Sequence, residues 1–185
     1  MPALEACRQL KEWSRTDPAR DLRLAVNVGP RQLAADGFVE QVIDILARTG
    51  ADPRLLEREV TEALPIHDIE AVIARMQALR TLGIRFAVDD FGIGNSSLSC
   101  LRQLPISVLK IDHSLVAGMA QPDGETRVRT TVQMALSLEL MVIAEGVEAD
   151  WQREMLPRHG CDQYQGYLVG RSVPIEVFDR ELQAV

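Results

Sequence analysis

The stretch FAVDDFGIGNSSL, from Phe86 to Leu98, decides how this chain is expected to fold. Three apolar residues lead into two adjacent carboxylates, Asp89 and Asp90, and a loop of glycines and serines follows. A short apolar run bounded by polar and glycine residues is typical of a strand buried in a parallel sheet. Two like charges at the end of such a strand repel each other, so we expect them either to share a proton or to hold a cation.

The same alternation of strands and helices extends along the whole chain. We predict strands at residues 22–28, 55–60, 84–88, 107–111, 140–144 and 163–167. We predict helices at residues 4–13, 37–50, 69–83, 97–103, 126–139, 150–159 and from Pro174 onward. Gly50 and Gly83 stand where helix-ending glycines are expected. No linker or low-complexity segment interrupts the pattern, which predicts a single α/β domain over residues 1–185.

The number of strands is too small for a closed barrel. A closed (β/α)₈ barrel has eight strands and typically ~250 residues, whereas this chain offers six strands in 185 residues. The predicted fold class is therefore α/β with a parallel sheet that is either open or completed by another segment. Open strand edges tend to pair with another chain, so we expect a homodimer or a protein partner that completes the sheet.

Composition limits the classes of function. The net charge of −7 and the lack of a basic cluster exclude a surface for nucleic acid polymers. A small phosphorylated ligand stays compatible, because bound cations can supply positive charge. The three cysteines (Cys7, Cys100 and Cys161) form no CxxC pair, which argues against a zinc site and fits a reducing cytoplasm. No apolar run approaches the ~18 residues of a membrane span.

Polar side chains stand at the end of nearly every predicted strand. They are Asn27, Glu59, Glu62, Asp89, Asp90, Lys110, Asp112, Glu145, Glu148 and Gln165. A parallel sheet brings such residues to one rim, where the chemistry of α/β folds gathers. Each one alone could be a helix cap or a solvated loop charge. Capping does not call for a doubled aspartate or for a lysine inside LKID, so the set as a whole favours a binding site.

Oxygen-rich clusters without cysteine or a suitable histidine are typical of sites for hard cations, here Mg²⁺ or Mn²⁺. Two such ions at one rim suit the hydrolysis of a phosphodiester. Gly92 and Gly94 allow backbone angles that other residues avoid, and we expect them to form a loop beside the ions. Ser96 and Ser97 are interpreted as caps of the helix that follows.

Six motifs in order make the chain resemble a known family. They are VNVG (26–29), EVTE (59–62), DDFGIGNSSL (89–98), LKID (109–112), AEGVE (144–148) and QGYLVGRSVP (165–174). Their order and spacing are similar to those of EAL domains, bacterial phosphodiesterases that hydrolyse cyclic di-GMP to pGpG. The resemblance covers essentially all of the chain. It implies an α/β fold, an incomplete (β/α)₈ TIM-type barrel of about six parallel strands with flanking helices. Other Mg²⁺-dependent barrel enzymes, such as aldolase or enolase relatives, fit this sequence far less well, because they share the polar rim but not the ordered motifs.

The resemblance implies a role for each matching residue. It implies that Asn27, Glu59, Asp89 and Glu145 bind one metal ion, and that Asp90 and Asp112 serve a second. Lys110 would hold or polarise the attacking water, with Glu145 as the other catalytic residue. Thr61 and Glu62 would anchor the DDFG loop with Phe91 and Gly92, and Glu148 and Gln165 would line the substrate side. The implied ligands are cyclic di-GMP and two Mg²⁺ or Mn²⁺ ions.

The chain also departs from the family pattern. The Glu-Ala-Leu segment that names the family has no counterpart here, nor do two barrel strands and a phosphate-binding arginine. Ile93, Asn95 and Gly29 stand where the family has threonine, tyrosine and serine. We therefore expect a truncated EAL domain that is weakly active or inactive alone. The alternatives are an active phosphodiesterase once the strands are supplied, or a module for dimerisation or regulation by protein contact.

Overall fold

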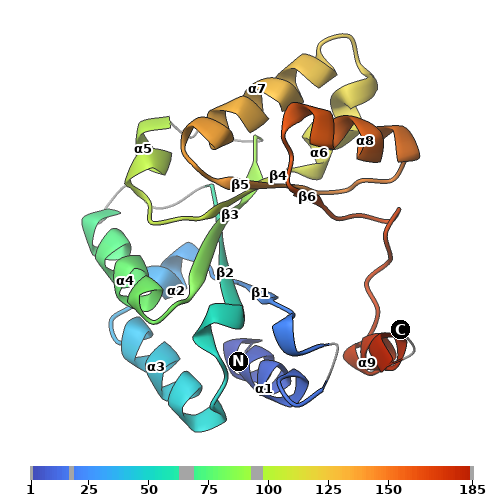
Figure 1. The fold of residues 1–185 in the computed structure, drawn as a ribbon. Helices are drawn as coiled ribbons and strands as arrows, with labels where there is room; N and C mark the ends of the chain where they lie inside the picture. Colours follow the sequence, from blue (N-terminus) through green and yellow to red (C-terminus); the bar gives the residue numbers. More distant parts are fainter. Residues whose placement is uncertain (1, 17–18, 63–68, 93–97, 184–185) are drawn as a thin grey trace.

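Six parallel strands form one curved sheet in the order β1-β2-β3-β4-β5-β6. The computed structural model describes residues 2–16, 19–62, 69–92 and 98–183. The strands are β1 (Leu24–Asn27), β2 (Leu56–Thr61), β3 (Arg85–Phe91), β4 (Val108–Ile111), β5 (Met141–Ala144) and β6 (Gln163–Tyr164). Figure 1 shows them side by side as a half-barrel, with the helices around its outer side.

The helices follow the strands in alternation. They are α1 (Pro2–Trp13), α2 (Pro30–Ala34), α3 (Phe38–Thr49), α4 (Ile69–Thr81), α5 (Leu98–Gln103), α6 (His113–Ala117), α7 (Gly124–Ser137), α8 (Asp150–Met155) and α9 (Ile175–Gln183). Short 3₁₀ turns occur at Ala19–Asp21, Pro53–Leu55, Gly118–Ala120 and Leu156–His159. None of the described helices is both long and apolar enough to cross a lipid bilayer.

Side-chain alternation along the strands separates a core from a polar inner face. On β2, Leu56 and Val60 are completely buried, as are Phe86 on β3 and Leu109 on β4. These residues pack against the helices and form the hydrophobic core. The residues that alternate with them, including Glu59 and Lys110, point to the concave side of the sheet. The polar rim is therefore a consequence of the two-residue period of the strands.

The six predicted strands are confirmed, but some boundaries were wrong. The apolar pattern predicted that the third strand ends before Asp89, whereas β3 continues through both aspartates to Phe91. Strand β6 has only two residues, fewer than the stretch 163–167 predicted. The short helices α2 and α6 were not predicted, because five residues are too few to show helical periodicity. Helix α9 begins one residue after Pro174.

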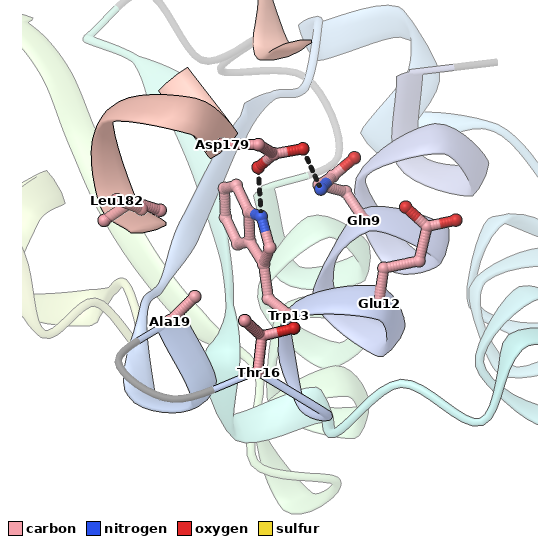
Figure 2. A pocket seen from close by; sticks show the side chains of 7 residues that line it. All are labelled: Gln9, Glu12, Trp13, Thr16, Ala19, Asp179 and Leu182. Carbon is pink, nitrogen blue, oxygen red and sulfur yellow. Dashed lines mark hydrogen bonds between the residues drawn. The ribbon is translucent and has the colours of Figure 1, made fainter. Parts of the chain in front are cut away.

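The C-terminal helix docks on the N-terminal helix, far from it in sequence. Beyond β6 the chain runs to α9, which lies beside α1 (Figure 1). Figure 2 shows the contact: Asp179 accepts a hydrogen bond from the indole Nε1 of Trp13 at 2.7 Å and one from Gln9 Nε2 at 3.5 Å. The ring of Phe178 lies 5.7 Å from that of Trp13, centroid to centroid. A small cavity of about 90 Å³, lined also by Leu182, lies beside this contact.

Asp179→Ala is expected to loosen this docking. The variant leaves the indole N–H of Trp13 without its acceptor, and this should lower the free energy of unfolding by about 1 kcal/mol. Trp13 emission should shift to longer wavelength, measured in a Trp151→Phe background that leaves Trp13 as the only tryptophan. Glu176→Ala on the exposed side of α9 is the matched control. Identical emission spectra for both variants would show that Asp179 does not hold α9 in place.

Candidate functional site

Lys110 is the centre of the site. It lies on β4, is 6% exposed, and its ammonium group contacts three carboxylates from other parts of the sheet. Lys110 Nζ is 2.6 Å from Glu59 Oε1, 3.0 Å from Asp89 Oδ1 and 2.6 Å from Glu145 Oε1. Glu59 is on β2, Asp89 is on β3, and Glu145 directly follows β5. The parallel register thus brings residues 86 positions apart into one cluster, as the sequence predicted.

The cluster keeps Lys110 protonated. Burial by itself lowers the pKa of Lys110, but its hydrogen bonds to Glu145 and Glu59 outweigh this effect and raise the pKa above its usual value. Burial raises the pKa of Glu145, and the charges of Asp89 and Glu59 add to this against the lowering effect of Lys110. Lys110 can therefore donate a hydrogen bond near neutral pH.

A β-bulge explains how two adjacent aspartates serve one rim. In a regular strand, neighbouring side chains point to opposite faces of the sheet. The pairing of β3 with β4 shifts between Val88 and Phe91, and Asp90 has a left-handed backbone with φ +54°. Such a bulge re-aims a side chain, here that of Asp90. Asp89 and Asp90 consequently lie together with Glu145, each offering an oxygen within 4.8 Å of the other two.

This trio fits a hard divalent cation. Asp89 Oδ1 is buried and accepts no hydrogen bond of good geometry from any described residue, although Lys110 Nζ is 3.0 Å away. A buried carboxylate oxygen without a hydrogen bond is costly unless another cation binds it. Burial raises the pKa of Asp90, and the charges of Asp89 and Asp112 raise it further. Oxygen ligands of this kind match Mg²⁺ or Mn²⁺.

The DDFG turn is attached to the neighbouring strand. Glu62 Oε2 accepts a hydrogen bond from the backbone N–H of Gly92 at 3.2 Å. Gly92 has φ +107°, and a Cβ at this position would run into the side chain of Leu115. Thr61 pairs in register with Asp89, and Phe91 is buried and pairs with Ile111. The bond between Glu62 and Gly92 ties the turn to β2, and the anchoring roles of Thr61, Glu62, Phe91 and Gly92 stay predictions. Residues 93–97, with Ile93 and Asn95, lie outside the described residues.

Among the described residues, Asp112 acts as the N-terminal cap of α6. Its Oδ1 accepts a hydrogen bond from Ser114 N at 2.8 Å, which caps α6, and its Oδ2 lies 3.0 Å from His113 Nδ1. Burial alone raises the pKa of Asp112, but the hydrogen bonds of Ser114 and His113 outweigh it and lower the pKa. Neither Asp112 nor Glu59 belongs to the described trio of converging oxygens. Their predicted roles as metal ligands stay predictions.

A large open cavity adjoins the rim. It has a volume of about 750 Å³, within the range of small-molecule sites, and Glu145, Glu148 and Gln165 line it. Gln165 Nε2 donates a hydrogen bond to Glu145 Oε1 at 2.6 Å. Tyr167 and Arg171 also line the cavity, and the guanidinium of Arg171 lies 4.7 Å from the centre of the Tyr167 ring. The predicted substrate residues Glu148 and Gln165 therefore line one cavity. The Tyr167–Arg171 pair lines the same cavity and lies within the motif QGYLVGRSVP, but the sequence analysis did not predict a role for it.

Asn27 is the remaining predicted ligand. It is exposed at the end of β1 and pairs in register with Glu59.

One buried residue at the site was missed by the sequence analysis: Gln152 hydrogen bonds to the backbone around Glu148. A glutamine at the third position of a helix can indicate a capping box, and this is the only sequence signal for Gln152. The signal is weak here, because Ala149 stands where such a box usually has serine or threonine.

Comparisons with known proteins agree with this geometry. The sequence model of the EAL domain family matches residues 4–172 of this chain. MucR from Pseudomonas aeruginosa, a bifunctional diguanylate cyclase/cyclic di-GMP phosphodiesterase, is 39% identical over 173 residues, or 93% of this chain and 25% of the relative. The chain thus spans about a quarter of the length of the curated relatives that it matches.

Solved structures show the same fold. The phosphodiesterase PaMucR in complex with c-di-GMP is 38% identical with a TM-score of 0.88, covering 95% of this chain and 71% of that one. The EAL domain of Mycobacterium smegmatis DcpA is 35% identical with a TM-score of 0.91, covering 98% and 82%. A manganese and c-di-GMP complex of Klebsiella pneumoniae BlrP1 is 30% identical with a TM-score of 0.76, covering 90% and 43%. With its family model matched over nearly its whole length, this chain belongs to the EAL domain family.

Proposed function

We propose that this chain carries the metal-binding rim and substrate cavity of a cyclic di-GMP phosphodiesterase that works in bacterial cytoplasmic signalling. The observation that carries the proposal is the contact of Lys110 Nζ with three carboxylates at 3.0 Å or less. A protonated lysine beside oxygens that can hold Mg²⁺ or Mn²⁺ suits the hydrolysis of an anionic diester. Relatives described as cyclic di-GMP phosphodiesterases, and a neighbour solved with this nucleotide, support the choice of substrate.

The residues divide into ligands and positioning groups. Asp89, Asp90 and Glu145 would hold a divalent ion, with Asn27 and Glu59 beside them and Asp112 as the predicted ligand of a second ion. When bound, such ions polarise the phosphoryl oxygens and lower the pKa of bound water.

Lys110 then orients the attacking water by donating a hydrogen bond, and Gln165 fixes the carboxylate of Glu145. The water oxygen bonds to phosphorus as one ester P–O bond breaks, which opens the cyclic dinucleotide to pGpG. The attacking water would lose a proton to a carboxylate of the rim, and the ester oxygen that leaves phosphorus would take up a proton from solvent. Glu148 and Gln165 are proposed to contact the guanine side of the cavity.

Turnover by this chain alone is expected to be weak. In the described sheet, β1 pairs only with β2 and β6 only with β5, so one side of the rim has no neighbouring strand. Strand edges of this kind bind further strands, and we propose that a second copy or a partner protein covers them. Four large apolar residues in the chain that follows β6 are at least 40% exposed: Tyr167, Val169, Val173 and Ile175.

Those exposed residues favour a second candidate function, a module for protein contact without catalysis. Burying an apolar patch of this kind would stabilise a complex. The variant Val169→Asp, at the most exposed of the four positions, should then raise the dimer dissociation constant in sedimentation equilibrium at least tenfold. Leu82→Asp, at an exposed apolar residue in the turn after α4, is the control. Equal dissociation constants for wild type and Val169→Asp would remove the support for this alternative.

The test of the proposed function is calorimetric titration of cyclic di-GMP into the chain with Ca²⁺, followed by product analysis with Mn²⁺. We expect saturable binding with Ca²⁺ and slow formation of pGpG with Mn²⁺. Glu145→Gln should abolish pGpG formation, whereas Glu139→Gln, at an exposed acid in the turn after α7, should not. Binding without any turnover would leave only the second candidate, and a folded chain that binds no nucleotide would refute the proposal.

A further inference from the structure

The loop that carries Glu145 and Glu148 is held by a side chain that the reaction does not use. Gln152 lies in the first turn of α8 and is 6% exposed. Its Oε1 accepts hydrogen bonds from the backbone N–H groups of Glu148 at 2.9 Å and Ala149 at 3.0 Å. Glutamine at this helical position commonly caps the helix in this way. The contacts so far could be explained by capping alone.

The other end of the same side chain reaches a different element. Gln152 Nε2 donates a hydrogen bond to the backbone carbonyl of Val116 at 3.2 Å. Val116 belongs to α6, the helix capped by Asp112 at the end of the LKID motif. Capping of α8 does not require this bond. Gln152 therefore joins the loop after β5 to the helix that follows β4.

The loop is also fixed on its opposite side. Val147 N donates to Gln165 O at 3.0 Å, and Leu168 N donates to Val147 O at 3.0 Å. Gly146 has φ +68°, and a Cβ there would come within 2.6 Å of the Cβ of His113. The loop consequently lies between the β6 segment on one side and α6 on the other. On the α6 side, Gln152 Oε1 accepts the hydrogen bonds that the backbone N–H groups of Glu148 and Ala149 donate.

We propose that Gln152 is a positioning residue that couples the Glu145–Ala149 loop to α6 and so sets where Glu145 and Glu148 stand. Glu145 must lie 2.6 Å from both Lys110 Nζ and Gln165 Nε2, a geometry that a displaced loop would lose. The consequence for ligand binding rests on the proposed function, because cyclic di-GMP is the ligand of the adjoining cavity. The mechanical coupling itself does not depend on that function.

Two variants separate coupling from capping. Gln152→Glu keeps the oxygen that caps Glu148 N and Ala149 N but replaces the donor to Val116 with a second carboxylate oxygen. Gln152→Leu removes both functions. Gln133→Ala, an exposed glutamine on α7, is the control. For each folded variant we would measure amide hydrogen exchange, the ¹³C shift of the Val116 carbonyl, and the dissociation constant of cyclic di-GMP with Ca²⁺.

In Gln152→Glu, we expect normal protection of the Glu148 and Ala149 amides, a shifted Val116 carbonyl resonance and about threefold to tenfold weaker binding of cyclic di-GMP. In Gln152→Leu, the two amides should also exchange at least tenfold faster. A Gln152→Glu protein with wild-type carbonyl shift and wild-type affinity would show that Gln152 only caps α8. If the wild type binds no cyclic di-GMP, the proposed function fails, while the exchange rates and carbonyl shift still decide on the coupling.

Discussion

Lys110→Met is expected to lower the free energy of unfolding by about 3 kcal/mol in metal-free buffer. The variant leaves Glu59, Asp89 and Glu145 close together without their shared cation, and each of these carboxylates is 15% exposed or less. Uncompensated buried charges are among the most destabilising changes in a protein. Urea unfolding at pH 7 with a chelator present measures the loss. Hydrolysis of cyclic di-GMP should disappear as well.

A divalent cation should recover part of this stability, because it can supply the positive charge that methionine lacks. We expect the difference between wild type and Lys110→Met to be smaller in Mn²⁺ than in chelator. The only other lysine in the chain, Lys11 on α1, gives a matched control, and Lys11→Met should change the unfolding free energy by less than about 0.5 kcal/mol. A Lys110→Met protein as stable as the control would mean that the cluster does not need its ammonium group.

Arg58→Met is expected to have the opposite effect and to raise the free energy of unfolding by about 1–4 kcal/mol. Arg58 lies on β2 on the helix side of the sheet and is 1% exposed. Its Nε and Nη1 donate no hydrogen bond to any described residue, and its guanidinium lies 5.8 Å from the ring centre of Phe38. Burial lowers the pKa of Arg58 to about 10, although the nearby Cys7 acts in the opposite direction. A methionine fills similar space without carrying a charge into the core.

Denaturant unfolding of wild type and Arg58→Met compares the two free energies directly. Arg127→Met on α7 removes an exposed arginine and should change stability by less than about 0.5 kcal/mol. A clear loss of stability in Arg58→Met would show instead that the guanidinium has a stabilising partner. Cyclic di-GMP binding should stay unchanged, since Arg58 faces away from the rim.

The convergence of the rim residues could be predicted from sequence because it follows from parallel topology. Asp89 and Glu145 directly follow apolar runs, whereas Glu59 and Lys110 lie near the ends of predicted strands. The carboxyl ends of parallel strands meet at one edge of the sheet. The structure brings these four together around Lys110 Nζ. Helix α3 likewise ends before Gly50, as predicted.

Three other features could not be predicted from sequence, because they depend on how strands and helices distant in the chain pack together. The bulge at Asp90 and its φ of +54° arise where β3 meets β4, so the apolar pattern could not show that both aspartates face the same rim. The link from Gln152 to Val116 joins residues 36 positions apart, and the docking of Asp179 on Trp13 joins residues 166 positions apart. Contacts of this range are set by the packing of whole elements.

The most direct test of the central claim is a Mn²⁺ titration followed by electron paramagnetic resonance, in which bound ions lose the signal of free Mn²⁺. Wild type should bind Mn²⁺ saturably, and Asp89→Asn should weaken the tightest site at least tenfold, since Asp89 supplies the buried oxygen that accepts no hydrogen bond from the described residues. Asp44→Asn on the surface of α3 should bind like wild type. Equal Mn²⁺ affinity in wild type and Asp89→Asn would contradict the assignment of this rim as a metal site.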